Sequence, residues 1–362
     1  MMMSNLCVPL LLITLTMAAD AQWDLQNGHT DANLRGIVNV SSGVVWASGT
    51  NGTVIQSTDE GATWRKCAPV PGAEKLDFRG IQAWDDKVAI VMSAGTGDDS
   101  RLYKTTDSCK SWKLVFINPD KEGFWDTLHR VSKNELYILG DPVDGKFSLF
   151  VSTDSGQTWS KSNDAGLESG PGGGAFAASN TSLTSVGRWI FFGGAGVPAA
   201  RIYYSDADCP KGTGPVCWGS VATAMATGTS ASGIFSIAGK ASGRKPSAAN
   251  TVLVAVGGTY NRAGETKGTA TYSLDGGRTW TMASIPPHGY LSCVAYDAAS
   301  GAWIAVGTNG TDVSSDDGRT WRGVGSDATI SDNWNALSLP FAVGPKGRIG
   351  KLKRGMAWGG SK

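Results

Sequence analysis

Hydrophobic and polar positions alternate in short runs along this chain, and turn-forming residues separate the runs. In one stretch, three runs precede a polar turn and a fourth follows it: Phe78–Trp84, Val88–Met92, Arg101–Lys104 and Lys113–Phe116. Runs of β-branched and aromatic residues bounded by Gly, Asp and Asn predict β-strands. Outside the N-terminus, no segment of the sequence has a sustained helical period. We therefore predict an all-β fold made of four-stranded units.

A polar phrase of eight residues recurs along the chain, at Ser57–Trp64, Thr105–Trp112, Ser152–Trp159, Ser273–Trp280 and Ser314–Trp321. Its carboxylate can accept hydrogen bonds from the turn backbone, and its glycine can take a positive φ. Its tryptophan can bury a large ring between sheets. A repeated phrase of this kind indicates a repeat architecture. We predict structural roles for Asp59, Asp107, Asp154, Asp275 and Asp316, and for Trp64, Trp112, Trp159, Trp280 and Trp321.

The phrase is the Asp-box (BNR) signature, and the chain resembles the β-propellers that carry it. The long gap between Trp159 and Trp280 holds a broken box, Tyr204–Cys209, which reaches its tryptophan only at Trp218. At the C-terminal end, Trp334–Ser338 and Arg348–Leu352 resemble strands of a blade that lacks its box. The strand around Trp23 should complete that blade and close the ring, because an open array would leave unpaired edges. The prediction is a seven-bladed propeller.

The N-terminal segment predicts that the protein is exported. Leu6–Met17 is apolar but short for a membrane span, and Ala19–Ala21 supplies small residues before a cleavage at Gln22. We therefore assign residues 1–21 to a signal peptide, 22–352 to a single propeller domain and 353–362 to a C-terminal tail. The mature chain is expected in the periplasm or outside the cell, as a monomer with no membrane span.

The charge balance narrows the classes of partner. Lys and Arg number 32 against 31 Asp and Glu, so nothing favours nucleic acid or an anionic membrane as a general partner. With 3 His in the whole chain, a Cys–His zinc site is not expected. The prediction is therefore that no cofactor and no metal is bound.

Five of the 6 cysteines lie in the predicted mature chain. Cys209 and Cys217 bracket the insertion in the broken box, and an oxidising compartment would favour a disulfide between them. Cys67 and Cys109 fall on the outer strand of one unit and in the box of the next, which allows a second bridge. Cys293 would then be a buried thiol.

The candidate chemistry lies on one face. If every box joins a third strand to a fourth, the loops between blades and the loops after second strands emerge together on the opposite face. Those loops concentrate carboxylates, arginines and aromatic residues, and propeller ligands commonly bind where loops meet the axis. The candidate ligand-binding residues are Arg35, Asp77, Arg79, Trp125, Asp144, Lys146, Glu168, Asn180, Arg201, His288, Trp334 and Asn335. In an enzyme, Asp126, Asp141 and Tyr290 would be the catalytic candidates.

Each candidate also has a purely structural interpretation. An Asp in a turn is most often a turn-former, and Asp141–Gly145 fits an Asx turn while lacking the ligand density of a dedicated calcium loop. His288 follows two prolines and fits a rigid turn. Glu168 precedes a Gly-rich run, but no strand–glycine–helix context follows, which argues against a nucleotide site. The prediction therefore depends on the cluster of residues and on no single member.

Two groups of propellers resemble this chain. Gly140–Phe147 and Pro286–Tyr290 are similar to phrases in exported bacterial propellers of the photosystem II stability/assembly-factor-like group. That resemblance implies a binding protein without catalysis. Members are often labelled oxidoreductases, but this chain shows no dinucleotide fingerprint or metal cluster to match the label.

The second group is the sialidases, which use an arginine triad, a Tyr–Glu nucleophile pair and an Asp acid. The resemblance would assign Arg35, Arg79 and Arg201 to the triad, Tyr290 to the nucleophile and Asp126 to the acid. However, Phe78–Ile81 lacks the proline of the Phe-Arg-Ile-Pro phrase of sialidases. We predict a propeller that binds a glycan, peptide or protein on the face opposite the boxes. The alternative is a glycoside hydrolase or polysaccharide lyase, since paired carboxylates beside aromatic residues suit sugar chemistry.

Overall fold

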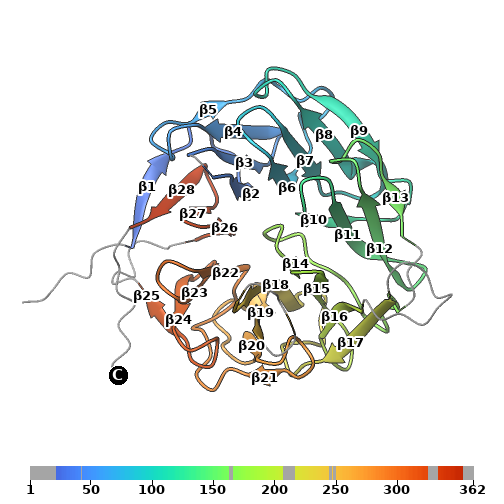
Figure 1. Cartoon of the computed structure of the whole chain (residues 1–362), viewed down its shortest axis with the longest axis vertical. Helices are drawn as coiled ribbons and strands as arrows, with labels where there is room; N and C mark the ends of the chain where they lie inside the picture. Colours follow the sequence, from blue (N-terminus) through green and yellow to red (C-terminus); the bar gives the residue numbers. More distant parts are fainter. Residues whose placement is uncertain are drawn as a thin grey trace, which may run out of the picture.

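A computed structural model describes residues 22–41, 43–162, 166–206, 217–243, 247, 250–324 and 333–353. Seven four-stranded antiparallel sheets surround a central axis (Figure 1), which confirms the seven-bladed propeller. No α-helix lies among these residues, and their short 3-10 turns include η1 (Gly97–Asp99) and η3 (Tyr260–Arg262). We number the blades from the sheet that contains β2.

The first four blades follow one another along the chain. In each, the first strand lies next to the axis and the fourth lies outermost (Figure 1). Their strands are β2 (Leu34–Asn39), β3 (Val45–Gly49), β4 (Thr53–Ser57) and β5 (Arg65–Lys66); β6 (Phe78–Ala83), β7 (Ala89–Ser93), β8 (Arg101–Thr105) and β9 (Lys113–Ile117); β10 (Trp125–Arg130), β11 (Leu136–Val143), β12 (Lys146–Ser152) and β13 (Ser160–Lys161); and β14 (Leu183–Val186), β15 (Trp189–Gly194), β16 (Arg201–Asp206) and β17 (Cys217–Ala222).

The last three blades have the same plan, except that the seventh takes its outermost strand from the start of the chain. Their strands are β18 (Ser232–Ala241), β19 (Thr251–Thr259), β20 (Ala270–Ser273) and β21 (Thr281–Met282); β22 (Cys293–Asp297), β23 (Ala302–Gly307), β24 (Gly310–Ser314) and β25 (Arg322–Val324); and β26 (Ala336–Ser338), β27 (Phe341–Val343), β28 (Arg348–Leu352) and β1 (Trp23–Asn27).

Strand β1 closes the ring. It pairs antiparallel with β28, from Trp23 opposite Leu352 to Asn27 opposite Arg348. The Trp23 indole N–H donates to Thr311 Oγ1 of the sixth blade at 3.0 Å. Because an outer strand from one end of the chain completes a sheet from the other end, no blade is left with an unpaired third strand.

Tryptophans from the outer part of each blade fill the interfaces between blades. The buried hydrophobic residues form seven clusters, each between two neighbouring sheets. Each cluster contains one tryptophan that stands at a fourth strand, so the count of tryptophans gives the count of blades. These are Trp64, Trp112, Trp159, Trp218, Trp280, Trp321 and, in the interface of blades six and seven, Trp23.

Every complete box folds as the same hydrogen-bonded turn between the third and fourth strands. In the first, Ser57 Oγ donates to Asp59 Oδ1 at 2.8 Å, Thr63 N–H to Asp59 Oδ1 at 2.9 Å and Thr63 Oγ1 to Asp59 Oδ2 at 2.5 Å. The Thr63 and Ser57 hydrogen bonds lower the pKa of Asp59 to about 2. The same pattern surrounds Asp107, Asp154, Asp275 and Asp316.

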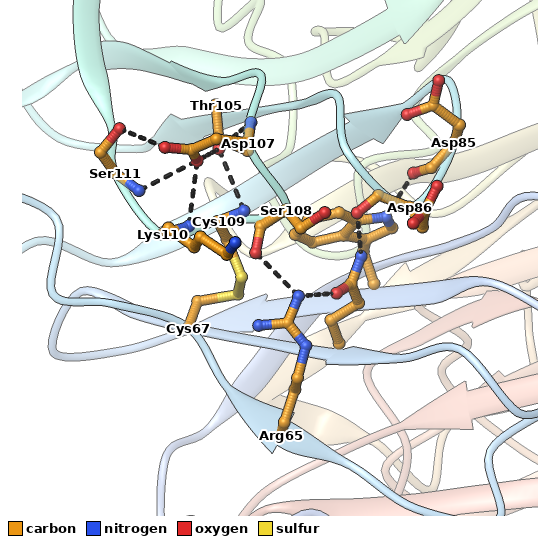
Figure 2. Close-up of a disulfide and its surroundings, with 12 residues drawn as sticks. Arg65, Cys67, Asp85, Asp86, Thr105, Asp107, Ser108, Cys109, Lys110 and Ser111 are labelled. Atoms are coloured by element: carbon orange, nitrogen blue, oxygen red, sulfur yellow. Dashed lines mark hydrogen bonds between the residues drawn. A yellow bond between two sulfur atoms is a disulfide. The ribbon is translucent and has the colours of Figure 1, made fainter.

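A disulfide joins the first two blades. Cys67 lies just after β5, and Cys109 stands in the second box where the other boxes have glycine, with φ 53°. The Cα atoms are 5.3 Å apart. Beside the bond, Arg65 Nη2 donates to the Ser108 carbonyl at 2.7 Å (Figure 2). The bridge that the sequence allowed is therefore present, and Cys293 is a buried free thiol as expected.

The turns separate into two faces. On the box face, the Glu60 N–H donates to the Gly43 carbonyl at 2.9 Å, so a box contacts the loop between first and second strands. On the opposite face, the Gly97 N–H donates to the Gly123 carbonyl at 2.8 Å. That bond links a loop after a second strand to a loop between blades, as the sequence predicted.

Several predictions concern residues outside the described ranges. The proposed signal peptide and nearly all of the tail lie there, as does Cys209. Cys217, which begins β17, is disulfide-bonded, but its pairing with Cys209 stays a prediction. Among the described residues, no helix is long and apolar enough to span a membrane.

Candidate functional site

Four of the innermost strands share a local irregularity next to the axis. The pairing with the second strand shifts register at Arg35 in β2, Arg79 in β6, Asp126 in β10 and Phe235 in β18. Such a β-bulge adds one residue and re-aims its side chain. A small residue follows each bulge, and at Gly36 an added Cβ would lie 2.5 Å from Ser48 Oγ.

Bulge residues of three blades contribute to an axial cavity of about 400 Å³. Two more blades contribute Ser292 and Asn335, which directly precede the innermost strands β22 and β26. We call this space the axial cavity. Its lining consists of Arg35, Arg79, Phe176, Ala177, Ala178, Phe235, Tyr260, Tyr290, Ser292, Thr308, Trp334 and Asn335.

One side of the axial cavity is cationic. Arg79 Nε donates to Asp77 Oδ2 at 2.8 Å, and Arg79 Nη1 donates to the Ala177 carbonyl at 3.4 Å. Arg35 makes no hydrogen bond or ion pair with any described residue, and its Nε is buried without a partner. Burial and the neighbouring Arg79 lower the pKa of Arg35, and Asp77 and Tyr290 oppose that shift. Among the described residues, Asp77 is the carboxylate that forms an ion pair with either guanidinium, and it pairs with Arg79.

The other side is aromatic. The rings of Phe176 and Phe235 stack with centroids 3.7 Å apart, and Tyr290 meets Phe235 edge-on at 4.8 Å. Tyr260 extends this group outward and is 52% exposed. Burial raises the pKa of Tyr290, with Arg35 acting in the opposite direction. The Tyr290 phenol is therefore neutral near pH 7, which suits a hydrogen-bond donor better than a nucleophile.

Polar groups on the remaining wall are partly satisfied. Asn335 Nδ2 donates to Asn33 Oδ1 and to the Leu34 carbonyl, both at 2.7 Å, which fixes its orientation. In contrast, Thr308 Oγ1 and the Trp334 indole nitrogen are buried without a hydrogen-bond partner. The Trp334 ring packs against Trp23 in the interface of blades six and seven, so only the Thr308 hydroxyl marks a place at the cavity where a partner is missing.

Four of the twelve ligand-binding candidates line the axial cavity: Arg35, Arg79, Trp334 and Asn335. Of the three catalytic candidates, Tyr290 lines it. Asp77 adjoins it through its ion pair with Arg79. Asn180 lies deeper, where its Oδ1 accepts a hydrogen bond from the Leu128 N–H at 2.7 Å and ties neighbouring blades together.

The two carboxylates proposed as catalytic do not line this cavity. Asp126 is only 2% exposed, and burial followed by the charge of Asp141 raises its pKa well above the usual range, while Arg79 opposes the shift. Burial also raises the pKa of Asp141, although the Ala175 N–H donates to its Oδ1 at 2.9 Å. Burial is thus the main cause of both shifts.

Other candidates lie apart from the axial cavity. Asp144 and Lys146 line a separate hollow of about 270 Å³, and Lys146 Nζ is 3.5 Å from Glu168 Oε1. Arg201 donates through Nε to Ser220 Oγ at 3.1 Å on the outer part of the fourth blade. Trp125 was expected on the surface, but it is fully buried and stacks on Phe116. Its position at the start of β10 points the ring into the interface of blades two and three.

His288 belongs to a polar contact of its own. Its Nδ1 is 2.6 Å from Asp312 Oδ2, and its Nε2 lies 2.8 Å from the Asn309 carbonyl. The hydrogen bond with Asp312 raises the pKa of His288 to about 9. Because Asp312 is fully buried, this contact serves to satisfy a buried carboxylate.

The sequence prediction missed Phe176, Phe235, Tyr260, Ser292 and Thr308. One signal was present: Arg-Gly-Ile occurs at 35–37 and again at 79–81, at the same place in successive units. Extending that position to the other blades would have found Phe235 and Ser292. The described residues contain no group of three or more His, Cys, Asp or Glu that could hold a metal ion.

Known proteins share the fold of this chain. No protein-family model and no curated protein matches its sequence. A structure of YCF48 bound to D1 peptide superposes with a TM-score of 0.60, at 16% identity over 94% of this chain and 99% of that one. YCF48 from Cyanidioschyzon merolae has a TM-score of 0.60 at 18% identity, covering 92% and 99%.

A third similar structure is the extracellular domain of a putative one-component system from B. thetaiotaomicron. Its TM-score is 0.55 at 12% identity, over 91% of this chain and 40% of that chain. At these identities the likeness is one of fold. The expected similarity to assembly-factor-like propellers is therefore confirmed as a shared propeller architecture.

Proposed function

We propose that this chain is an exported binding propeller that holds a peptide segment of a protein partner in the axial cavity. The observation that carries the proposal is the origin of the cavity lining. Bulge residues and loops from several blades bring cationic, aromatic and polar groups together on the face opposite the boxes. Clefts of this size that combine apolar walls with a few polar groups are typical ligand sites.

The chemistry of the cavity favours binding over turnover. Its lining contains donors and rings but no carboxylate, since Asp126 and Asp141 lie outside it. General acid–base chemistry requires a group within hydrogen-bond reach of the proton that it moves. Tyr290, the one catalytic candidate in the lining, has its pKa raised by burial.

A protein of the same fold offers a precedent for the ligand class, because YCF48 has been solved with a D1 peptide bound. The Cys67–Cys109 disulfide supports export, since such bonds persist in oxidising compartments. We extend both points to this chain as parts of the proposal.

A display library of random peptides tests the proposal. The mature chain should select a family of peptides, and filling the cavity with Ala178→Trp should abolish their binding while the protein stays folded. Ala178 lines the cavity and is half-buried, so a larger side chain there has room to enter it. Leu25→Trp, on the exposed edge of β1, is the matched control. Selected peptides that bind Ala178→Trp unchanged would refute the axial cavity as the site.

A further inference from the structure

The guanidiniums in the lining of the axial cavity outnumber the carboxylates that form ion pairs with them. Arg35 and Arg79 line it, and Asp77 is the carboxylate that the structure pairs with them. Asp77 Oδ2 is bonded to Arg79, whereas Arg35 has no partner among the described residues. An arginine stays protonated in proteins, so these three groups leave one positive charge. A partly buried cation without a counterion is costly, and a bound anion would remove that cost.

From this imbalance we infer that the axial cavity binds a peptide group with one carboxylate beside an aromatic side chain, and that Arg35 is its anchor. The inference rests on the proposed function and adds the chemical class of the ligand. One unpaired guanidinium matches one carboxylate in charge, and its fork of N–H groups matches a carboxylate in geometry.

An unpaired hydroxyl of another lining residue agrees with this assignment. Arg35 Nε and Thr308 Oγ1 are both buried and have no hydrogen-bond partner. They come from the first and sixth blades, which lie on either side of the seventh. An ionised carboxylate accepts hydrogen bonds only, so it can pair with both the Arg35 guanidinium and the Thr308 hydroxyl acting as a donor.

The aromatic requirement comes from the opposite wall. Phe176, Phe235 and Tyr290 form a contiguous group, and Tyr260 continues it to the surface with 52% exposure. Aromatic rings favour offset or edge-on contacts with another ring. A peptide whose carboxylate meets Arg35 can therefore place a neighbouring ring on this wall.

Calorimetric titration of three acetylated pentapeptides tests the inference. The first, Gly-Ala-Gly-Ala-Phe, has a free C-terminus; the second is its C-terminal amide; the third, Gly-Ala-Asp-Phe-Ala amide, carries its carboxylate on a side chain. We expect at least one carboxylate peptide to bind about tenfold or more tightly than the amide. Whichever binds more tightly identifies the source of the carboxylate, the chain end or an acidic side chain.

Variants assign the effect to Arg35. Arg35→Gln should remove the preference for a carboxylate, and Arg35→Lys should keep part of it because the charge remains. Arg201→Gln, an arginine outside the cavity, should leave the preference unchanged. Equal affinity of the amide and the carboxylate peptides, or a preference that survives Arg35→Gln, would overturn the inference.

Failure of this inference can be told apart from failure of the proposed function. If library peptides need an open cavity but the carboxylate peptides do not bind, only the inference fails. If neither the library nor the pentapeptides respond to Ala178→Trp, both fail.

Discussion

On the box face, the polar side chains of each turn bond to one another, whereas the axial cavity keeps donors that lack acceptors. Asp59 accepts three hydrogen bonds within its own turn. Across the ring, Arg35 Nε and Thr308 Oγ1 are buried and unpaired. Paired polar groups stabilise the fold, whereas a buried charged group without a partner gains from an acceptor that the fold does not supply. The contrast separates structural polar residues from binding ones.

Removing the ring closure should have the largest effect on stability. Trp23→Ala deletes a ring that is 4% exposed and packs 5.3 Å from Trp334, and we expect a loss of about 3–5 kcal/mol in the free energy of unfolding. Urea unfolding measures it, with Leu25→Ala on the exposed side of the same strand as the control. A Trp23→Ala midpoint equal to that of the parent would contradict the closure.

Removing a box carboxylate should cost stability without changing ligand binding. Asp316→Ala deletes the acceptor for Ser314 Oγ and for the backbone and hydroxyl of Thr320, and we expect a loss of about 1–3 kcal/mol. The same variant should bind cavity ligands like the parent. Asp31→Ala, an exposed aspartate outside the boxes, is the comparison. Weaker ligand binding at full stability would break the distinction between the two faces.

The His288–Asp312 pair should make stability fall in mild alkali. The pKa of His288 is raised to about 9 in the folded chain, from about 6.5 when unfolded. Its contribution is therefore fully present below pH 6.5 and is lost as the pH rises through 9. Because the ring is 43% exposed, screening reduces the effect to about 1–2 kcal/mol. Unfolding of His288→Gln should lack this slope; a parent curve that is flat from pH 6.5 to 9 would exclude the pair as a stabilising contact.

Removing the unpaired cation should have the smallest effect on stability. Arg35→Gln relieves repulsion from Arg79, so the free energy of unfolding should stay within about 1 kcal/mol of the parent, with any change favourable. Thermal unfolding of the ligand-free protein checks it. A large loss of stability would show that Arg35 holds the loops together. Arg35 would then be a structural residue, like the box carboxylates, and not a binding residue.

The fold was predictable because its rules repeat. Each box places a carboxylate, a turn residue and a tryptophan at fixed spacing, and the same hydrogen bonds form every time. Even Trp23, which has no box, could be placed by analogy with the other tryptophans. Local chemistry of this kind needs no knowledge of distant contacts.

The candidate site was only partly predictable because its residues share a position and not a chemical type. Arg35 and Phe235 occupy corresponding bulges, yet nothing in their side chains connects them in the sequence. Trp125 shows the converse error, because its place between two blades made it a ligand-binding candidate although its ring is buried in the core. Which way a bulge turns a side chain depends on pairing with the next strand, and composition does not reveal it.

The composition of the seventh blade also determines when the ring can close during synthesis and folding of the chain. Strand β1 is made first, but its partner β28 ends at Leu352, more than three hundred residues later. At the usual pace of synthesis this delay is roughly 15–65 seconds. Until then β1 has no sheet to join, and Leu25 and Trp23 are open to other partners. The ring is thus completed only when β28 has been made. A chaperone that shields β1 would be needed until that point.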